Sequence, residues 1–87
     1  MWWLPMRNYD KMTLSILVRK NIRKYRKMRN YTPQELADRA GFTHQYVRDL
    51  ECPSVDKTPT LEALGKFANA LDIDIRQLFD DINDDNE

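Results

Sequence analysis

The sequence predicts an all-α fold with five helices. Apolar residues recur at spacings of three and four along the chain, which is the pattern of helices with one buried face. No clear run of alternating apolar and polar residues indicates a strand. Glycine is limited to Gly41 and Gly65, so most of the 87 residues favour helical backbone. A chain of this length forms one small domain with a thin margin of stability, which a partner subunit would increase.

The first helix is predicted over residues 13–29. Apolar residues of this segment form one stripe at helical spacing: Leu14, Leu17, Val18, Ile22, Tyr25 and Met28. Asn30 follows as a residue suited to the left-handed conformation that ends many helices. Residues 1–12 precede this helix and are interpreted as an apolar N-terminal arm that includes Trp2 and Trp3.

A second helix is predicted over residues 33–40. Thr32 and Glu35 form a Thr-x-x-Glu capping box, in which side-chain oxygens accept from amides of the first turn. Pro33 occupies the first helical position, where its missing N–H loses no bond. Gly41 can adopt the positive φ that a tight turn between two helices requires.

A third helix is predicted over residues 44–51, with Thr43 as its N-cap. Val47 and Leu50 lie three apart and turn one apolar stripe back onto the preceding helix. Two short helices joined by a sharp turn are the arrangement of a DNA-binding helix-turn-helix, whose second helix enters the major groove.

Two more helices are predicted over residues 61–71 and 75–82. Thr60 caps the first, and close packing is expected at its Gly65. An Asp-x-x-Gln box of Asp74 and Gln77 opens the second. The expected apolar stripes are Leu61, Leu64, Phe67, Ala68 and Leu71 in the fourth helix and Ile75, Leu78, Phe79 and Ile82 in the fifth. The domain therefore spans residues 13–82, and residues 83–87 form an acidic tail.

The charged residues are divided unequally between the two halves of the chain, although the formal net charge is zero. Residues 1–48 hold eleven Lys/Arg and three Asp/Glu, a net charge of +8. Residues 49–87 hold three Lys/Arg and eleven Asp/Glu, a net charge of −8. Such asymmetry favours a polyanionic partner for the basic half, although ordinary solvated helix surfaces give the same pattern.

Several classes of function find no support in the sequence. The single cysteine, Cys52, excludes an internal disulfide and is typical of a cytoplasmic protein. No secretory signal and no stretch of membrane-spanning length are present. His44 and Cys52 do not form a metal-ligand pattern, and no glycine-rich phosphate loop or nucleophile elbow is found. We therefore expect no enzymatic activity, no cofactor, no metal, no small-molecule ligand and no membrane association.

Motifs over about residues 15–80 resemble the Cro/repressor-type helix-turn-helix family of bacterial and phage transcription regulators. The matching positions are Ile22, Arg26, LADRAG at 36–41, Val47-x-x-Leu50-Glu51, Pro59-Thr60-Leu61, Leu64, Ala70-Leu71-x-Ile73 and Leu78-Phe79. The segment Tyr46–Glu51 is similar to a subgroup that includes controller proteins of restriction–modification systems. The resemblance implies a five-helix lambda-repressor-like DNA-binding domain. The chain departs from the family pattern at Pro53, where a glycine is usual, and in a longer loop before Pro59.

The resemblance implies that side chains near the start of the third helix read DNA bases: His44, Gln45, Arg48 and Asp49. Glutamine pairs bidentately with adenine, and arginine with guanine, so Gln45 and Arg48 suit this role. Other roles stay open for three of them. Arg48 would alternatively hold a phosphate, Asp49 would pair with a cation, and His44 would be an ordinary exposed residue.

A second set of residues is expected to contact phosphates and to fix register without reading sequence. Its members are Gln34, Thr43, Lys57, Arg23, Lys27 and Arg29. The alternative for any one of these cations is a plain solvated helix face.

The leading interpretation is a sequence-specific regulator that binds double-stranded DNA as a homodimer on a palindromic operator. In relatives a C-terminal helix often forms the two-fold contact, and the residues expected there are Ile75, Leu78, Phe79 and Ile82. The alternative is a protein-interaction module on the same fold, either antitoxin-like or coactivator-like, whose basic half binds an acidic protein.

Overall fold

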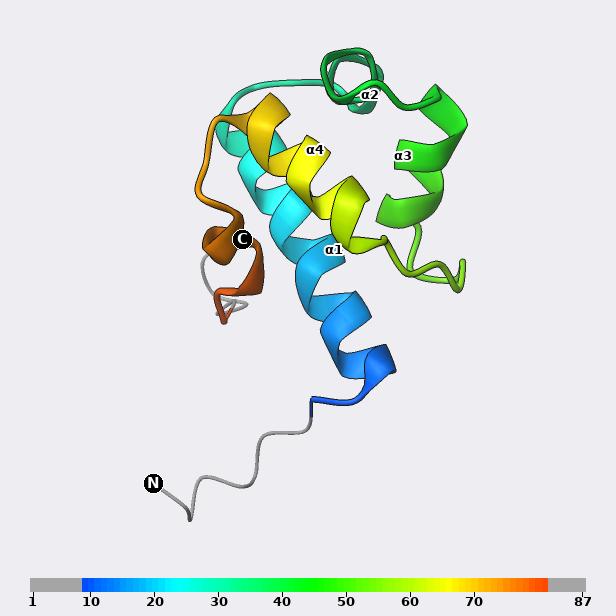
Figure 1. Ribbon diagram of the computed structural model, residues 1–87. Coiled ribbons are helices and arrows are strands. Elements are labelled where there is room, and N and C mark those ends of the chain that lie inside the picture. Colours follow the sequence, from blue (N-terminus) through cyan, green and yellow to red (C-terminus); the bar gives the residue numbers. More distant parts are fainter. Residues whose placement is uncertain (1–8, 82–87) are drawn as a thin grey trace.

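The computed structural model describes residues 9–81, and every regular element in this part of the chain is a helix, as the predicted all-α class requires. Its elements are α1 (Lys11–Met28), α2 (Pro33–Ala40), α3 (His44–Glu51), α4 (Leu61–Leu71) and a short 3-10 helix, η1 (Ile75–Phe79). α1 and α4 lie side by side at the centre, with α3 on one side of them and η1 on the other (Figure 1). The predicted arm residues Trp2 and Trp3, and the predicted acidic tail, lie outside the described residues.

α1 begins earlier than predicted, at Lys11 instead of residue 13. The reason is a cap that we had not predicted, in which the Asp10 carboxylate accepts from the Thr13 amide at 2.8 Å. The helix ends at Met28, one residue before the predicted end, and the predicted left-handed conformation of Asn30 is confirmed by its φ of 61°. Met28 differs from the prediction, because it is 64% exposed instead of part of the buried stripe.

The capping signals of the helix-turn-helix are confirmed. The Thr32 hydroxyl accepts from the Glu35 amide at 3.0 Å, and the Glu35 carboxylate accepts from the Thr32 amide at 2.8 Å. Gly41 ends α2 with a φ of +83°. Thr43 caps α3 by accepting from the Tyr46 amide at 3.1 Å. These local interactions fix where each of the two helices begins and ends.

Three predictions for the C-terminal region were wrong. Leu61 is 79% exposed at the first position of α4, and an added Cβ at Gly65 would meet no atom within 4 Å. The fifth element is a five-residue 3-10 helix instead of an α-helix to residue 82, although its Asp74–Gln77 box is present. A side-chain amide of α1 explains the early end, since Asn21 Nδ2 donates to the carbonyls of Leu78 and Asp80, each at 2.8 Å.

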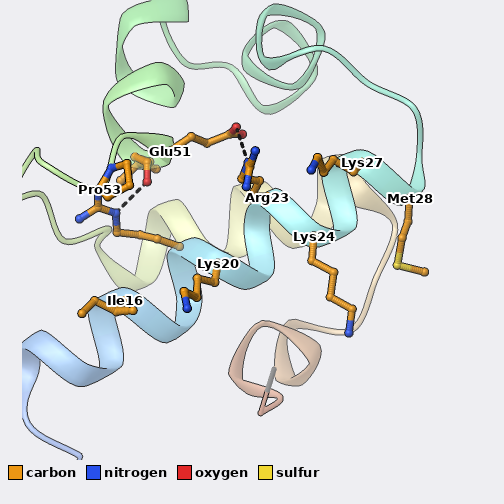
Figure 2. Close-up of a pocket in the computed structure, with 10 residues that line it drawn as sticks. Ile16, Lys20, Arg23, Lys24, Lys27, Met28, Glu51 and Pro53 are labelled. Atoms are coloured by element: carbon orange, nitrogen blue, oxygen red, sulfur yellow. Dashed lines mark hydrogen bonds and ion pairs between the residues drawn. The ribbon is translucent and has the colours of Figure 1, made fainter. Parts of the chain in front are cut away.

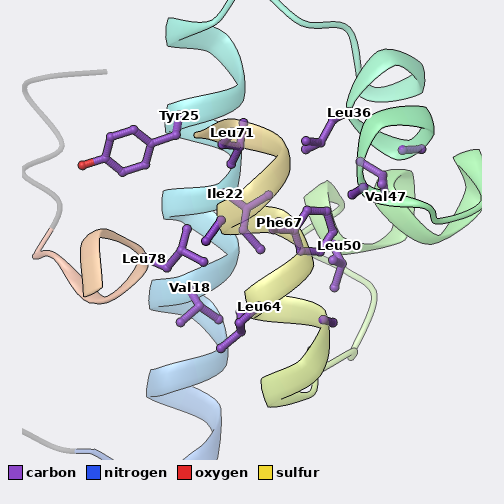
Figure 3. Close-up of a cluster of buried hydrophobic side chains, with 14 residues drawn as sticks. Val18, Ile22, Tyr25, Leu36, Val47, Leu50, Leu64, Phe67, Leu71 and Leu78 are labelled. Carbon is purple, nitrogen blue, oxygen red and sulfur yellow. The ribbon is translucent and has the colours of Figure 1, made fainter. Parts of the chain in front are cut away.

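The hydrophobic core draws on every described helix. α1, α4 and η1 meet around Ile22, Phe67 and Leu78, each fully buried, and α2 and α3 close the other side (Figure 3). The remaining buried apolar residues are Val18, Tyr25, Leu36, Ala37, Ala40, Val47, Leu50, Ala63, Leu64, Ala68 and Leu71. α2 packs on α4, and α3 packs on α2 and α1, so these contacts set the direction in which the outer face of α3 points.

A buried ion pair joins α1 to the end of α3. Arg26 Nε and Nη2 donate to the two carboxylate oxygens of Glu51 at 2.6 and 2.8 Å, and both side chains are 11% exposed. The third nitrogen, Nη1, donates to the Tyr31 carbonyl at 2.7 Å, just before α2. One guanidinium therefore connects α1, the entrance to α2 and the exit from α3.

A second arginine of α1 satisfies the carbonyls at the C-terminus of α3. Arg19 donates to the carbonyls of Leu50 and Cys52 at 2.8 Å each, and to that of Asp49 at 3.2 Å. It also donates to the Lys57 carbonyl at 3.1 Å, as does the Ser15 hydroxyl. α1 therefore holds both the end of the third helix and the loop that follows it.

Gly65 and Gly41 should respond in opposite ways to alanine. Gly65→Ala should stabilise the domain by about 0.5–1 kcal/mol, because the site is open and alanine favours helix. Gly41→Ala should destabilise it by about 1–2 kcal/mol, because an L-residue resists a φ of +83°. Urea unfolding of the two variants and the parent measures both effects. A destabilised Gly65→Ala would show that the interior of α4 has no room for a methyl group.

Candidate nucleic-acid interface

α3 presents its polar side chains away from the core. Val47 and Leu50 anchor the helix, at 0% and 2% exposure, and so turn the opposite face outward. His44, Gln45 and Arg48 are exposed on that face. These are three of the four residues predicted to read bases.

His44 connects the first turn of α3 to α2. Its Nε2 lies 3.0 Å from Asp38 Oδ1, and both side chains remain largely open to solvent. The contact carries an opposite-charge attraction only when the imidazole is protonated. The contact links the first turn of α3 to α2 on the solvent-exposed side of the motif.

Gln45, Arg48 and Asp49 form one hydrogen-bonded network. Gln45 Nε2 donates to Asp49 Oδ1 at 2.7 Å, and Arg48 Nη2 donates to Gln45 Oε1 at 3.2 Å. Lys57 Nζ, from the loop after α3, lies 3.6 Å from Asp49 Oδ2. Asp49 is half-buried and serves as the centre of this network, which matches its alternative role as an ion-pair residue.

The network fixes the amide of Gln45 without using all of its hydrogen-bonding capacity. A glutamine amide has two N–H donors and two lone pairs on its oxygen. Since the network takes one of each, one donor and one acceptor of Gln45 remain. This donor–acceptor pair is what the major-groove edge of adenine requires.

The residues predicted to contact phosphates fall into two separate groups. Thr43 and Lys57 lie beside the outer face of α3, as the cap of the helix and the partner of Asp49. Gln34 is exposed on α2 four residues before Asp38, so it shares the helix face that meets His44. These three residues therefore lie near the residues predicted to read bases.

Arg23, Lys27 and Arg29 are not brought to that face. Arg23 Nε lies 3.8 Å from Glu51 Oε1, at the C-terminal end of α3, and Lys27 follows one turn later on α1. Arg29 donates to the carbonyls of Leu71 and Asp72, at 2.8 and 3.0 Å, and so caps the end of α4. The structure thus gives Arg29 a role different from the predicted phosphate contact.

Aromatic side chains pack against the start of α3 on its core side. The Tyr46 ring stacks on Phe67 with centroids 6.3 Å apart and meets Phe42 at 4.6 Å. Lys57 Nζ lies 5.1 Å from the centroid of Tyr46. Burial raises the pKa of the Tyr46 hydroxyl. Tyr46 therefore acts as a packing residue that also positions Lys57.

The loop after α3 contains the single cysteine. Cys52 Sγ lies 3.2 Å from the Ser54 hydroxyl, and hydrogen bonds from Ser54 lower the pKa of the thiol. In the part of the chain that the structure describes, no three His, Cys, Asp or Glu side chains gather in a way that could hold a metal ion. None of the helices within residues 9–81 is long and apolar enough to cross a membrane.

The residues predicted for a dimer contact also separate. Ile75 and Phe79 of η1 are 40% and 41% exposed. Leu78 is fully buried inside the domain, which corrects its predicted place at the interface, and Ile82 lies outside the described residues. Any contact through η1 therefore rests on Ile75 and Phe79.

Two capped helices joined at a left-handed glycine, with the second presenting a polar network outward, define a helix-turn-helix protein. A family model described as Helix-turn-helix matches residues 22–78. The chain belongs to this family, as the resemblance to Cro/repressor-type regulators predicted.

Two curated relatives carry the name HTH-type transcriptional regulator SinR. The protein from Bacillus subtilis (strain 168) is 29% identical over 65 residues, and the one from Bacillus licheniformis is 28% identical over 65 residues. Each match covers 75% of this chain and 58% of the relative, so the chain spans little more than half the length of these proteins. No solved structure gives a significant match.

Proposed function

We propose that the protein is a sequence-specific DNA-binding transcriptional regulator whose α3 enters the major groove. The observation that carries this proposal is the network on α3, in which Asp49 and Arg48 hold the Gln45 amide with one donor and one acceptor left. Family membership and the names of the relatives support the same function.

Base reading would then centre on Gln45, with His44 and Arg48 beside it. Gln45 would pair with an adenine, and each good bidentate pair discriminates by about 1–3 kcal/mol. Asp49 would act chiefly by orienting Gln45, because its Oδ1 already accepts from the Gln45 amide. Arg48 would reach a guanine or a neighbouring phosphate once it leaves Gln45.

Backbone contacts would come from Gln34, Thr43 and Lys57, which surround α3. Gln34 also lies in the first turn of α2, where exposed amides and the helix dipole favour an anion. Lys57 is held in place from both sides, since its carbonyl accepts from Arg19 and Ser15 while its ammonium lies near Asp49. The loop before Pro59, although longer than the family pattern, can thus still present a cation at a defined position.

We further propose that two copies pair through η1 on a palindromic operator. Ile75 and Phe79 supply exposed apolar surface on the side of α1 and α4 opposite to α3 (Figure 1). A two-fold pair would place the two copies of α3 about 34 Å apart, one turn of DNA, with half-sites about ten base pairs between centres.

Selection from random DNA duplexes tests the function directly, and Gln45→Ala tests the residue. An enriched palindrome is expected from the parent. Gln45→Ala should lower affinity for that site by about 1–3 kcal/mol while leaving affinity for unrelated DNA nearly unchanged, because the substitution removes the pairing with the base and the side-chain network on α3 but leaves the phosphate contacts in place. Asn69→Ala, an exposed amide on α4, is the control and should leave both affinities unchanged. Equal losses on both DNAs would exclude base reading by Gln45, and a selection without enrichment would favour a protein-interaction module.

The salt dependence of DNA binding tests the position of Lys57. Lys57→Gln should reduce the slope of log K against log[salt] by about 0.9 for each phosphate that the lysine neutralises in the parent. Lys66→Gln removes a cation that lies on α4 and pairs with Glu62, so it should leave the slope unchanged. Fluorescence anisotropy over a salt series measures both slopes. A parent slope near zero would mean that phosphates are not contacted at all.

Sedimentation of Phe79→Glu against the parent tests the dimer. The parent should sediment as a dimer at tens of micromolar, and the variant as a monomer, because a carboxylate would be buried without a partner at the contact. Leu61→Glu places the same charge on another exposed apolar residue and should leave the dimer intact. A parent that stays monomeric with and without operator would rule out this contact.

A further inference from the structure

A groove of about 480 Å³ runs along α1 beside the C-terminal end of α3, and the DNA contacts proposed above do not use it. Its lining includes Ile16, Lys24, Lys27 and Met28 from α1, with Glu51 and Pro53 opposite (Figure 2). From Ile16 to Met28 the helix rises about 18 Å, the length of three helical turns. The groove is therefore long enough for a short helix.

Apolar side chains mark both ends of the groove. Ile16 is 47% exposed and Met28 is 64% exposed, although both belong to α1, whose inner face is packed in the core. Between them, Lys24 and Lys27 line the groove, and their aliphatic stems add apolar surface beneath their charges, with the Lys24 ammonium 5.2 Å from the centroid of the Tyr25 ring. Pro53 and Leu50 complete the opposite wall.

The charge of the groove is positive. Arg23, Lys24 and Lys27 contribute cations along its length. Its one carboxylate in the described lining, Glu51, accepts two hydrogen bonds from the buried Arg26 and lies 3.8 Å from Arg23, so the positive charge of the groove rests mainly on its lysines. A matching occupant would carry a row of apolar residues with acidic residues beside it.

The groove lies at the end of α3 opposite to the base-reading residues. Glu51 is the last residue of α3 and His44 the first, so about 10 Å of helix separates the groove wall from the first turn. Arg23 points toward Glu51, at the C-terminal end of α3 (Figure 2). The groove can thus be occupied while α3 is on DNA.

We propose that this groove binds an acidic amphipathic helix of a partner protein. The helix lies along α1, places apolar residues at spacings of three and four against Ile16, Met28 and Pro53, and pairs its carboxylates with Lys24 and Lys27. This is the helix-in-groove mode of peptide recognition. The surface is separate from the proposed DNA contacts, so it does not rest on the proposed function.

A labelled synthetic peptide tests the proposal. The probe is an acidic helix about four turns long, with leucines at i, i+3, i+4 and i+7 and glutamates beside them. Anisotropy should show saturable binding that weakens with salt. A peptide of the same composition in shuffled order should bind at least about tenfold more weakly, because it lacks the apolar stripe.

Matched variants locate the binding site. Ile16→Asp and the double variant Lys24→Glu/Lys27→Glu should each weaken peptide binding about tenfold or more. Leu61→Asp and Lys66→Glu change an exposed apolar residue and a cation on α4 and should leave peptide binding unchanged. Circular dichroism confirms that each variant is folded before binding is measured.

Three results would overturn the proposal. The shuffled peptide binding as tightly as the amphipathic one would reduce the groove to a general polyanion surface. Equal losses in the α1 and α4 variants would place the peptide elsewhere. Displacement of the peptide by saturating duplex DNA would make the α1 cations part of the DNA contact. Because peptide binding is measured without DNA, it can succeed or fail whether or not the protein binds an operator.

Discussion

The buried ion pair between Arg26 and Glu51 holds the helix-turn-helix to the rest of the domain. Its geometry is bidentate, and the remaining nitrogen of the guanidinium reaches the Tyr31 carbonyl. Removing either partner would leave the other charged and buried, which costs about 3–5 kcal/mol in comparable pairs. That is a large share of the stability of so small a domain. The direction of α3, and with it the position of the candidate interface, depends on this contact.

The basic residues of α1 and its C-cap divide largely by type, with Arg23 as the exception, since it lines the outer groove together with the lysines. Arg19, Arg26 and Arg29 donate to carbonyls or a carboxylate at the ends of other elements. The planar, branched guanidinium suits such sites because it donates several hydrogen bonds in fixed directions. Lys24 and Lys27 line the outer groove instead. A charge count from the sequence treats arginine and lysine alike. Their different hydrogen-bonding chemistry explains why they take different places in the structure.

Local signals in the sequence predicted local structure correctly. The caps at Thr32, Thr43 and Thr60 and the turn at Gly41 depend on residues within three positions of each other, and the structure contains all of them. Features that depend on distant residues were not predictable in the same way. The early end of η1 follows from Asn21, 57 residues away from Leu78.

In the candidate site too, contacts within one helix were predictable from the sequence and contacts between distant residues were not. The sequence placed His44, Gln45, Arg48 and Asp49 on one helix, and the structure brings Lys57 to them. The role of Arg19 was missed because backbone carbonyls, its acceptors, have no signature in the sequence. Gly65 misled the prediction because a helical glycine usually has a packing reason, and here there is space around it.

The hydrogen bonds from Arg19 to the end of α3 also determine how the helix-turn-helix could be transferred to another protein scaffold. The carbonyls of Asp49, Leu50 and Cys52 accept from Arg19, which lies some thirty positions earlier in the chain. A synthetic fragment containing only α2 and α3 would leave those carbonyls to water and would lack the anchor at Glu51. Grafting the recognition segment onto another scaffold therefore requires a donor helix carrying arginines at the positions of Arg19 and Arg26. The transferable unit is the motif together with α1.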